Sequence, residues 1–208
     1  PACPAPKDRT DLRDKIIFLT DRESPSGATY IASVSVVYVM DPDGSNQRPL
    51  SESAACGHQT YEYFQERLSW SNDGLWRLLV ERSGSGTSIF LRSSTTGQLV
   101  RRVTTLDGNN YDPAWAPDQA RLAFVSQVDM NDEIYTVSID GTKTRRLTFN
   151  TWEWDKHPSW SVDGRYIVFW SNRETARKQI WVMRDDGQGP RNLSNNAYND
   201  WDPIWVNP

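Results

Sequence analysis

Histidine and cysteine are scarce in this sequence, and the common hydrolase motifs are missing. Only two histidines and two cysteines occur among 208 residues. The two cysteines form no metal-ligand cluster. The sequence contains neither a Gly-x-Ser-x-Gly elbow nor a His-Glu-x-x-His motif, the signatures of serine hydrolases and zinc peptidases. The composition and motifs therefore give no support for catalysis.

Long hydrophobic runs and basic clusters are also missing. The longest stretch of low polarity, residues 31–40, contains two serines and is far too short to span a membrane. Lys plus Arg number 23 against 27 for Asp plus Glu, which gives a net charge of -4 and a pI near 5.2. This balance does not fit nucleic-acid binding, which favours clustered positive charge. Without a starting methionine or signal sequence, the chain is expected to be a mature or trimmed product.

The two cysteines lie outside the regular part of the sequence. Cys3 is in a Pro/Ala-rich N-terminal arm, residues 1–14, and Cys56 is in an expected loop. A disulfide between them, within one chain or between two, would fasten these segments and indicate an oxidising compartment. Two unpaired thiols are the alternative. The arm is expected to pack on its own body or on a neighbour, because undocked arms are usually disordered.

Tryptophan returns at a constant interval. Trp70, Trp115, Trp160 and Trp205 are each 45 residues apart, a spacing typical of repeat architectures. Three residues after each of the first three tryptophans stands an aspartate that begins a turn, and an apolar run follows it near residues 78–80, 122–125 and 167–169. Continuous apolar runs of this length indicate strands that are covered on both faces.

A second set of apolar segments completes each repeat. These segments, at residues 37–40, 89–91, 134–137 and 180–183, each lead to a turn glycine. Four residues later comes an arginine, and then an apolar residue followed by Ser or Thr. Each repeat therefore predicts four short antiparallel strands, which is the size of one propeller blade.

The two ends of the chain complement each other. The last copy ends after its innermost strand, at residues 202–208, whereas the first copy begins at residues 14–22 without one. We therefore predict an all-β fold, a four-bladed β-propeller closed by pairing of the N- and C-terminal strands in one blade. Two alternatives are that two chains form one larger ring, or that the C-terminal strand completes the next chain's blade.

The expected domain organisation follows from this closure. After the arm, residues 15–208 form a single propeller domain. The expected blades are residues 15–51 plus 198–208, 61–105, 107–149 and 152–194. The first blade has two insertions, at residues 22–35 and 51–65, which should decorate the rim opposite the Asp-Gly turns. Insertions on one face of a repeat protein often mark its binding face, although neutral length drift explains them equally well.

Polar residues enter the expected innermost strands on the same rim. Three positions before each repeat tryptophan are Arg67, Asp112, His157 and Asp202, and five before are Gln65, Asn110, Asp155 and Asp200. The carboxylates Asp112, Asp155, Asp200 and Asp202 are the candidate ligands for a hard cation such as calcium. The alternative is that these side chains cap backbone groups at the crossover turns.

Aromatic residues on this rim do not belong to the tryptophan column. Tyr111, Trp152, Trp154, Tyr198 and Trp201 could stack on sugars or anchor a protein partner, or pack between adjacent crossover loops. His157 could act as a base or a ligand, or be one variable position in a repeated turn. The tentative binding residues are Tyr111, Asp112, Trp154, Asp155, His157, Asp200, Trp201 and Asp202.

The repeat unit resembles the WD40-like (PD40) repeat of the TolB-type β-propellers. The best matches are residues 155–164, 169–173 and 180–194, and the resemblance covers roughly residues 15–206. It implies a periplasmic or secreted propeller that acts as a binding platform, and such propellers sometimes precede a hydrolase domain. The chain has four repeats where six are usual in that family, and Leu68 replaces the repeat proline in the second copy.

The resulting functional prediction is a non-catalytic extracellular or envelope binding scaffold that acts through one loop-decorated rim. The expected partner is a protein or further copies of this chain, and a glycan is a lesser candidate. One alternative is a structural subunit that self-assembles through the N-terminal arm or strand exchange. A weaker alternative is a carbohydrate-binding or lyase-type site at the channel mouth. No cofactor other than calcium is expected.

Overall fold

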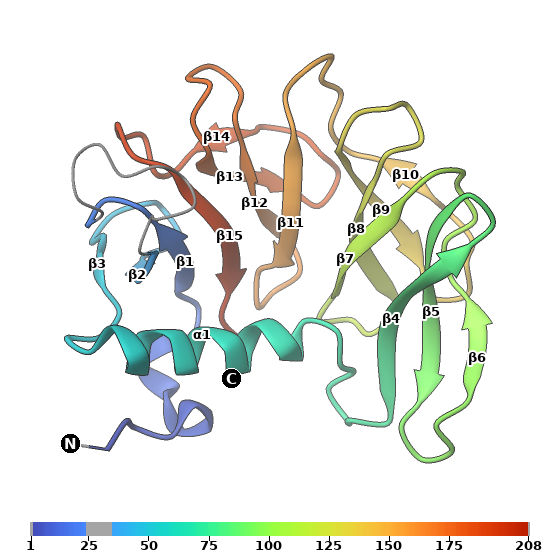
Figure 1. Cartoon of the computed structure of the whole chain (residues 1–208), viewed down its shortest axis with the longest axis horizontal. Coiled ribbons are helices and arrows are strands. Elements are labelled where there is room, and N and C mark those ends of the chain that lie inside the picture. Colours follow the sequence, from blue (N-terminus) through green and yellow to red (C-terminus); the bar gives the residue numbers. More distant parts are fainter. Residues whose placement is uncertain (1, 24–34, 208) are drawn as a thin grey trace.

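A computed structural model describes residues 2–23 and 35–207 of the chain. The described residues form four antiparallel sheets, which follow one another around an arc (Figure 1). Along the arc these are sheet A (residues 16–20 and 36–49 with 200–205), sheet D (155–192), sheet C (110–146) and sheet B (76–102). One sheet arises from each sequence repeat. The insertion at residues 22–35 lies largely outside the described residues. No helix in the described ranges has both the length and the apolar character needed to cross a membrane.

Sheet A joins the two ends of the chain, as the sequence predicts. Strand β15 from the C-terminal end pairs antiparallel with β1, placing Ile16 opposite Trp205. The strand order is β15-β1-β2-β3. Its strands are β1 (Ile16–Thr20), β2 (Val36–Met40), β3 (Arg48–Pro49) and β15 (Asp200–Trp205). This pairing occurs within one chain, so blade A needs no strand from a neighbour.

Sheets C and D are regular four-stranded blades, each built from one uninterrupted repeat. Sheet C contains β7 (Asn110–Trp115), β8 (Arg121–Ser126), β9 (Glu133–Ser138) and β10 (Arg145–Arg146). Sheet D contains β11 (Asp155–Trp160), β12 (Tyr166–Ser171), β13 (Gln179–Arg184) and β14 (Arg191–Asn192). Tight turns join β11 to β12 and β13 to β14, where Gly164 and Gly187 have φ values of +71° and +83°. Only glycine adopts such values without strain.

Sheet B has three strands, one fewer than the repeat predicts. They are β4 (Trp76–Ser83), β5 (Gly86–Ser93) and β6 (Leu99–Arg102). The innermost strand expected to lead into Trp70 is absent, because the preceding residues form helix α1 (Ala54–Arg67). The prediction of a strand around Gln65 and Arg67 is therefore wrong, as is the loop expected around Cys56.

Helix formation in this segment has local causes. The Ser53 hydroxyl caps the helix by accepting a hydrogen bond from the Cys56 N–H, and Ser is a favoured cap. At the other end the Leu68 N–H donates to Gln65 O at 3.2 Å. The other three repeats have proline at this position, which has no N–H to donate and disfavours helix in the residue before it. Leu68 therefore allows the helix to continue where the other repeats have a strand.

Each hydrophobic core lies between neighbouring layers of the arc. One cluster joins sheets A and D around Phe18 and Trp170, a second joins D and C around Phe169 and Ile134, and a third joins C and B around Phe124. The remaining face of sheet A is covered by α1. No hydrophobic cluster among the described residues joins sheet A to sheet B, although a closed four-bladed ring would require such contact.

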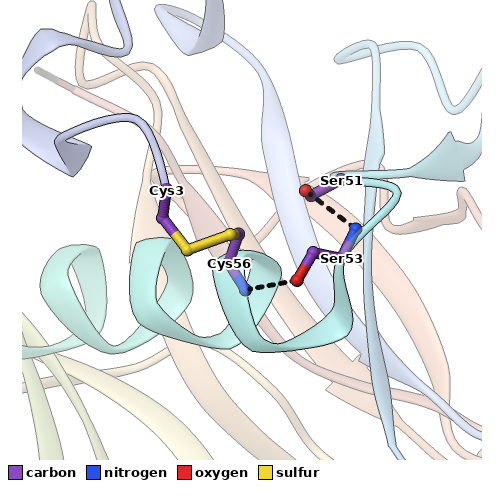
Figure 2. Close-up of a disulfide and its surroundings, with 4 residues drawn as sticks. All are labelled: Cys3, Ser51, Ser53 and Cys56. Carbon is purple, nitrogen blue, oxygen red and sulfur yellow. Dashed lines mark hydrogen bonds between the residues drawn. A yellow bond between two sulfur atoms is a disulfide. The ribbon is translucent and has the colours of Figure 1, made fainter. Parts of the chain in front are cut away.

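The N-terminal arm is docked rather than extended. It forms two short 3-10 helices, η1 (Pro6–Asp8) and η2 (Thr10–Leu12), and Leu12 is buried against sheet A. Cys3 and Cys56 form an intrachain disulfide with a Cα–Cα distance of 5.3 Å. Figure 2 shows this bond beside the Ser53 cap. The disulfide therefore fastens the arm to α1.

Candidate functional site

The inner strands β7, β11 and β15 bring Asp112, His157 and Asp202 together. Each inner strand has a register irregularity at this position, and the three residues adopt positive φ values of 51°, 52° and 50°. A bulge of this kind redirects a side chain out of the regular alternation. His157 Nε2 lies 3.4 Å from Asp112 Oδ2 and 3.2 Å from Asp202 Oδ1. We call these three residues the axial cluster.

The axial cluster lines a cavity of about 180 Å³, and α1 contributes another part of its wall. Tyr61 and Gln65 come from the helix, and Leu68 and Ser69 follow it. The Tyr61 hydroxyl donates to the Asp202 carbonyl oxygen at 2.8 Å. Sequence reasoning did not identify Tyr61 as a site residue. In the sequence, Tyr61, Phe64 and Leu68 have the spacing of residues on one face of a helix. This spacing is the signal that could have placed Tyr61 on a helix facing the site.

Asp112 gives the cavity an acidic wall. Burial raises the pKa of the Asp112 carboxyl, and the nearby His157 opposes that rise. Within the described part of the chain, no hydrogen bond reaches Asp112 Oδ2, although this atom is shielded from solvent. An under-satisfied buried carboxylate oxygen favours a ligand that donates hydrogen bonds or carries positive charge. The cavity could therefore receive an amine, a guanidinium or an amide group.

Asp155 and Asp200 are not at the cavity mouth. Both are fully buried inside their own blades, where Asp155 pairs with Arg173 and Asp200 pairs with Arg22. Asn110 holds the equivalent place in sheet C and donates to the carbonyl oxygens of Thr87 and Leu106. In sheets A, C and D, the residue five before the tryptophan thus stabilises its blade, whereas the residue three before it belongs to the axial cluster.

The four aspartates therefore do not converge on one point. Among residues 2–23 and 35–207, no group of three or more His, Cys, Asp and Glu side chains is placed to hold a metal ion. The expected ring of calcium ligands is separated into two carboxylates at the cavity and two that form ion pairs inside the blades.

Tyr111 and Trp154 share a lysine at the rim, while Trp201 lies beside another. The Lys156 ammonium is 5.8 Å from the Tyr111 ring centre and 5.2 Å from that of Trp154, within range of a cation–π interaction. The Tyr111 hydroxyl also donates to Asp132. Lys178 lies 5.3 Å from the Trp201 ring centre. These three aromatics are thus partly engaged in packing between neighbouring blades.

Other large apolar side chains on the loops of this rim are exposed. Trp152, the most exposed of the tryptophans, is 82% exposed. The set comprises Met130, Phe149, Trp152, Trp154 and Tyr198. They come from the β8–β9 loop and from the two crossovers that follow sheets C and D. Exposed apolar groups gathered on one rim commonly mark an interaction surface.

Comparison with known proteins identifies the family. Residues 7–207 match the family described as the TolB beta propeller domain. The chain belongs to this family. A solved structure of TolB from Agrobacterium tumefaciens superposes with a TM-score of 0.54 at 20% identity, covering 86% of this chain and 60% of that one. This similarity supports the TolB-type propeller fold of the described sheets.

Sequence relatives of this TolB-type propeller differ in their assigned roles. An uncharacterized protein of Agrobacterium fabrum is 34% identical over 134 residues, which are 64% of this chain and 44% of the relative. The Tol-Pal system protein TolB of Francisella tularensis subsp. mediasiatica is 30% identical over 142 residues, 66% of this chain and 32% of that protein. The uncharacterized peptidase YuxL of Bacillus subtilis is 34% identical over 99 residues, 45% of this chain and 15% of the peptidase. The chain thus spans less than half the length of each of these relatives.

Proposed function

We propose that this TolB-type propeller is a binding scaffold with no reaction of its own. Its protein partner binds the crossover rim, which is the rim formed by the β8–β9 loop and the crossovers after sheets C and D. The observation that carries the proposal is the axial cluster with its acidic cavity, together with the exposed aromatics on the loops of the rim. Exposed aromatic anchors are frequent hot spots of protein interfaces. The Tol-Pal name of one relative supports a protein partner for this chain.

The contacts of His157 support binding rather than hydrolysis. Its polar neighbours among the described residues are the carboxylates of Asp112 and Asp202. In the described residues, no Ser, Thr or Cys side chain is hydrogen-bonded to it, as a nucleophile activated by histidine would be. Relatives named as peptidases contain a much longer chain than the segment matched here. We therefore assign the propeller segment a recognition role.

The proposed location is the periplasm or the extracellular space. An intrachain disulfide fastens the arm to α1, and structural disulfides persist in oxidising compartments. Calcium and glycan binding are secondary proposals. A shift in melting temperature on adding calcium, or a positive glycan array, would support them.

Site-specific photo-crosslinking tests the rim. A photoreactive amino acid at Trp152 or Tyr198 should give a discrete cross-linked protein band in the native cell envelope. The matched control position is Asn72, an exposed residue at the Asp73–Gly74 turn on the opposite rim. Trp154→Ala and Asp112→Asn should weaken the band without lowering the melting temperature. Equal bands from both rims, or no band from the crossover rim, would count against the proposal.

A further inference from the structure

In the described part of the chain, no strand covers the inner edge of sheet B. The 45-residue repeat would place its inner strand at residues 65–70, but residues 65–67 belong to α1. What remains is a single bridge between Trp70 and Arg77 and two backbone hydrogen bonds, from the Leu78 N–H to Ser69 O at 2.8 Å and from the Ser71 N–H to Trp76 O at 2.9 Å. Among the described residues, β4 beyond Leu78 pairs with β5 alone.

The equivalent edge is filled in the regular blades. In sheet D, Lys156 pairs with Trp170 and Asp155 pairs with Ser171, and the residues of β4 at the same repeat positions are Val80 and Glu81. Backbone N–H groups point to alternate sides of a strand from one residue to the next. Because the Leu78 N–H faces the inner edge, the N–H groups of Val80 and Arg82 face it too. Within residues 2–23 and 35–207, no hydrogen bond reaches them on that edge. An unpaired edge is a template for a further strand.

The edge is bounded at both ends. At one end, the Ser69 carbonyl oxygen accepts the hydrogen bond of the Leu78 N–H, so the open edge begins after Leu78. At the other end the β4–β5 hairpin tip lies against the next crossover, because a Cβ atom built on Gly86 would be 2.1 Å from Gly108 O. The open segment therefore suits a short extended strand. Antiparallel pairing with a second copy would place Glu81 opposite Glu81, and like charges directly opposite are unfavourable.

Sheet B carries positive charge in an acidic protein. Its three strands contain five arginines and one acidic residue, Glu81, whereas the whole chain has a net charge of -4. The arginines are Arg77, Arg82, Arg92, Arg101 and Arg102. Arg77 and Arg92 lie directly opposite each other across β4 and β5.

The ion pairs of this sheet leave that charge incompletely matched. Arg77 reaches Glu66, and Arg92 reaches Glu81, only at 3.6 Å. The Nε atoms of both arginines are shielded from solvent and have no hydrogen-bond partner among the described residues. Alternation along the strand places Arg77 and Arg92 on the face of sheet B opposite to that of Val80 and Arg82. These two arginines therefore add to the positive field that attracts an acidic segment, but they do not contact a side chain opposite Arg82.

We propose that the inner edge of β4 binds an acidic extended segment of a partner protein by antiparallel strand addition. Its backbone pairs with Val80 and Arg82. An acidic side chain lies opposite Arg82, and an apolar side chain lies opposite Val80, which is 42% exposed. Cross-strand pairs of these kinds stabilise sheets. The edge is distinct from the aromatic rim, so it does not depend on the function proposed above.

The probe is the peptide acetyl-Thr-Glu-Thr-Val-Thr-amide, whose Glu and Val would face Arg82 and Val80. Amide exchange is followed by NMR in the intact protein. The amides of Val80 and Arg82 should exchange freely at first and at least about tenfold more slowly with saturating peptide. Methylating the peptide nitrogens of Glu and Val should abolish binding. Replacing its Glu with Lys should weaken binding by about tenfold.

Variants of the protein test the same edge. Val80→Pro removes the N–H on the open edge and should abolish peptide binding. The variant should still fold, because proline is tolerated on strand edges. Val80→Thr is the matched control that keeps the N–H. Trp154→Ala should leave peptide binding unchanged, which separates this site from the rim. Three results would overturn the proposal: slow exchange of both amides in the free monomer, equal binding of the methylated peptide, or a dimer in light scattering that Val80→Pro converts to a monomer.

Discussion

Polar residues two positions apart in one repeat have different structural roles. Asp155 lies in regular strand geometry, is fully buried, and pairs with Arg173 from the β12–β13 loop of the same blade. His157 follows two residues later, and the bulge turns its side chain toward Asp112 and Asp202. A carboxylate inside a blade therefore serves stability, while one at a bulge is available to a ligand.

Arg173→Met tests the buried pair. The change leaves the Asp155 carboxylate without its cation, and breaking a buried pair in this way should lower the free energy of unfolding by about 3 kcal/mol at pH 7. Urea denaturation measures the loss. Arg165→Met is the control, because the Arg165 side chain is 82% exposed and its contact with Asp163 is loose, with 3.8 Å between Nε and Oδ2. A loss no larger than that of the control would contradict the assigned role.

The effect of Arg173→Met should depend on pH. Burial raises the pKa of Asp155, and Arg173 opposes that rise. A raised pKa in the folded state gives a contribution to stability that is fully present below the ordinary aspartate pKa and is lost as pH rises through the raised value. Without Arg173 the pKa rises further. The difference in unfolding free energy between variant and wild type should therefore shrink as the solution is acidified toward pH 4.

At the scale of elements, α1 substitutes for a neighbouring blade. Its residues Tyr61 and Phe64 are buried on the face of sheet A that no other sheet covers in the described part of the chain. The same helix displaces the inner strand of sheet B and lines the axial cavity through Tyr61. One insertion thus changes two blades.

Phe64→Ala tests whether α1 covers sheet A. Truncating this buried ring should lower the free energy of unfolding by about 3–4 kcal/mol, through lost apolar burial and the cavity that remains. Chemical denaturation measures the change. Glu62→Ala, an exposed position of the same helix, should change stability by less than about 0.5 kcal/mol. Similar small losses from both variants would mean that the helix is not required to cover the sheet.

The disulfide constrains the segment between the arm and α1. Cys3 and Cys56 are 53 residues apart in sequence, and chain-entropy considerations give about 4 kcal/mol for closing a loop of that length. Replacing both cysteines with serine should lower the urea midpoint accordingly. Reductant should produce a similar loss in the wild type and none in the double variant. A wild type insensitive to full reduction would exclude this contribution.

At the scale of the whole molecule, the chain closes one of its blades with its own terminal strand. Because β15 pairs with β1 of the same chain, a single species near the 23.8 kDa chain mass is expected from light scattering, with and without reductant. Removing residues 200–208 should expose the β1 edge and cause aggregation. Large polymers of the intact chain that dissociate on reduction would instead favour the self-assembling subunit.

The sequence determined the elements that repeat. The spacing of tryptophans, turn aspartates and apolar runs predicts the strands of sheets A, C and D, and the incomplete terminal copies predict the pairing of β1 with β15. It also identified the cysteines that pair. These features follow from local patterning and turn chemistry, which act over a few residues and leave a periodic trace.

Only the tertiary structure decided which polar residues meet. Asp112 and Asp202 come to His157 from separate blades, while Asp155 and Asp200, equally suggestive in sequence, are paired with arginines inside their own sheets. The distinction depends on strand bulges and on the order of sheets around the arc. Helix α1 has local signals in the Ser53 cap and in Leu68, which replaces the repeat proline. That its apolar residues cover a face of sheet A is a long-range gain that local propensity does not encode.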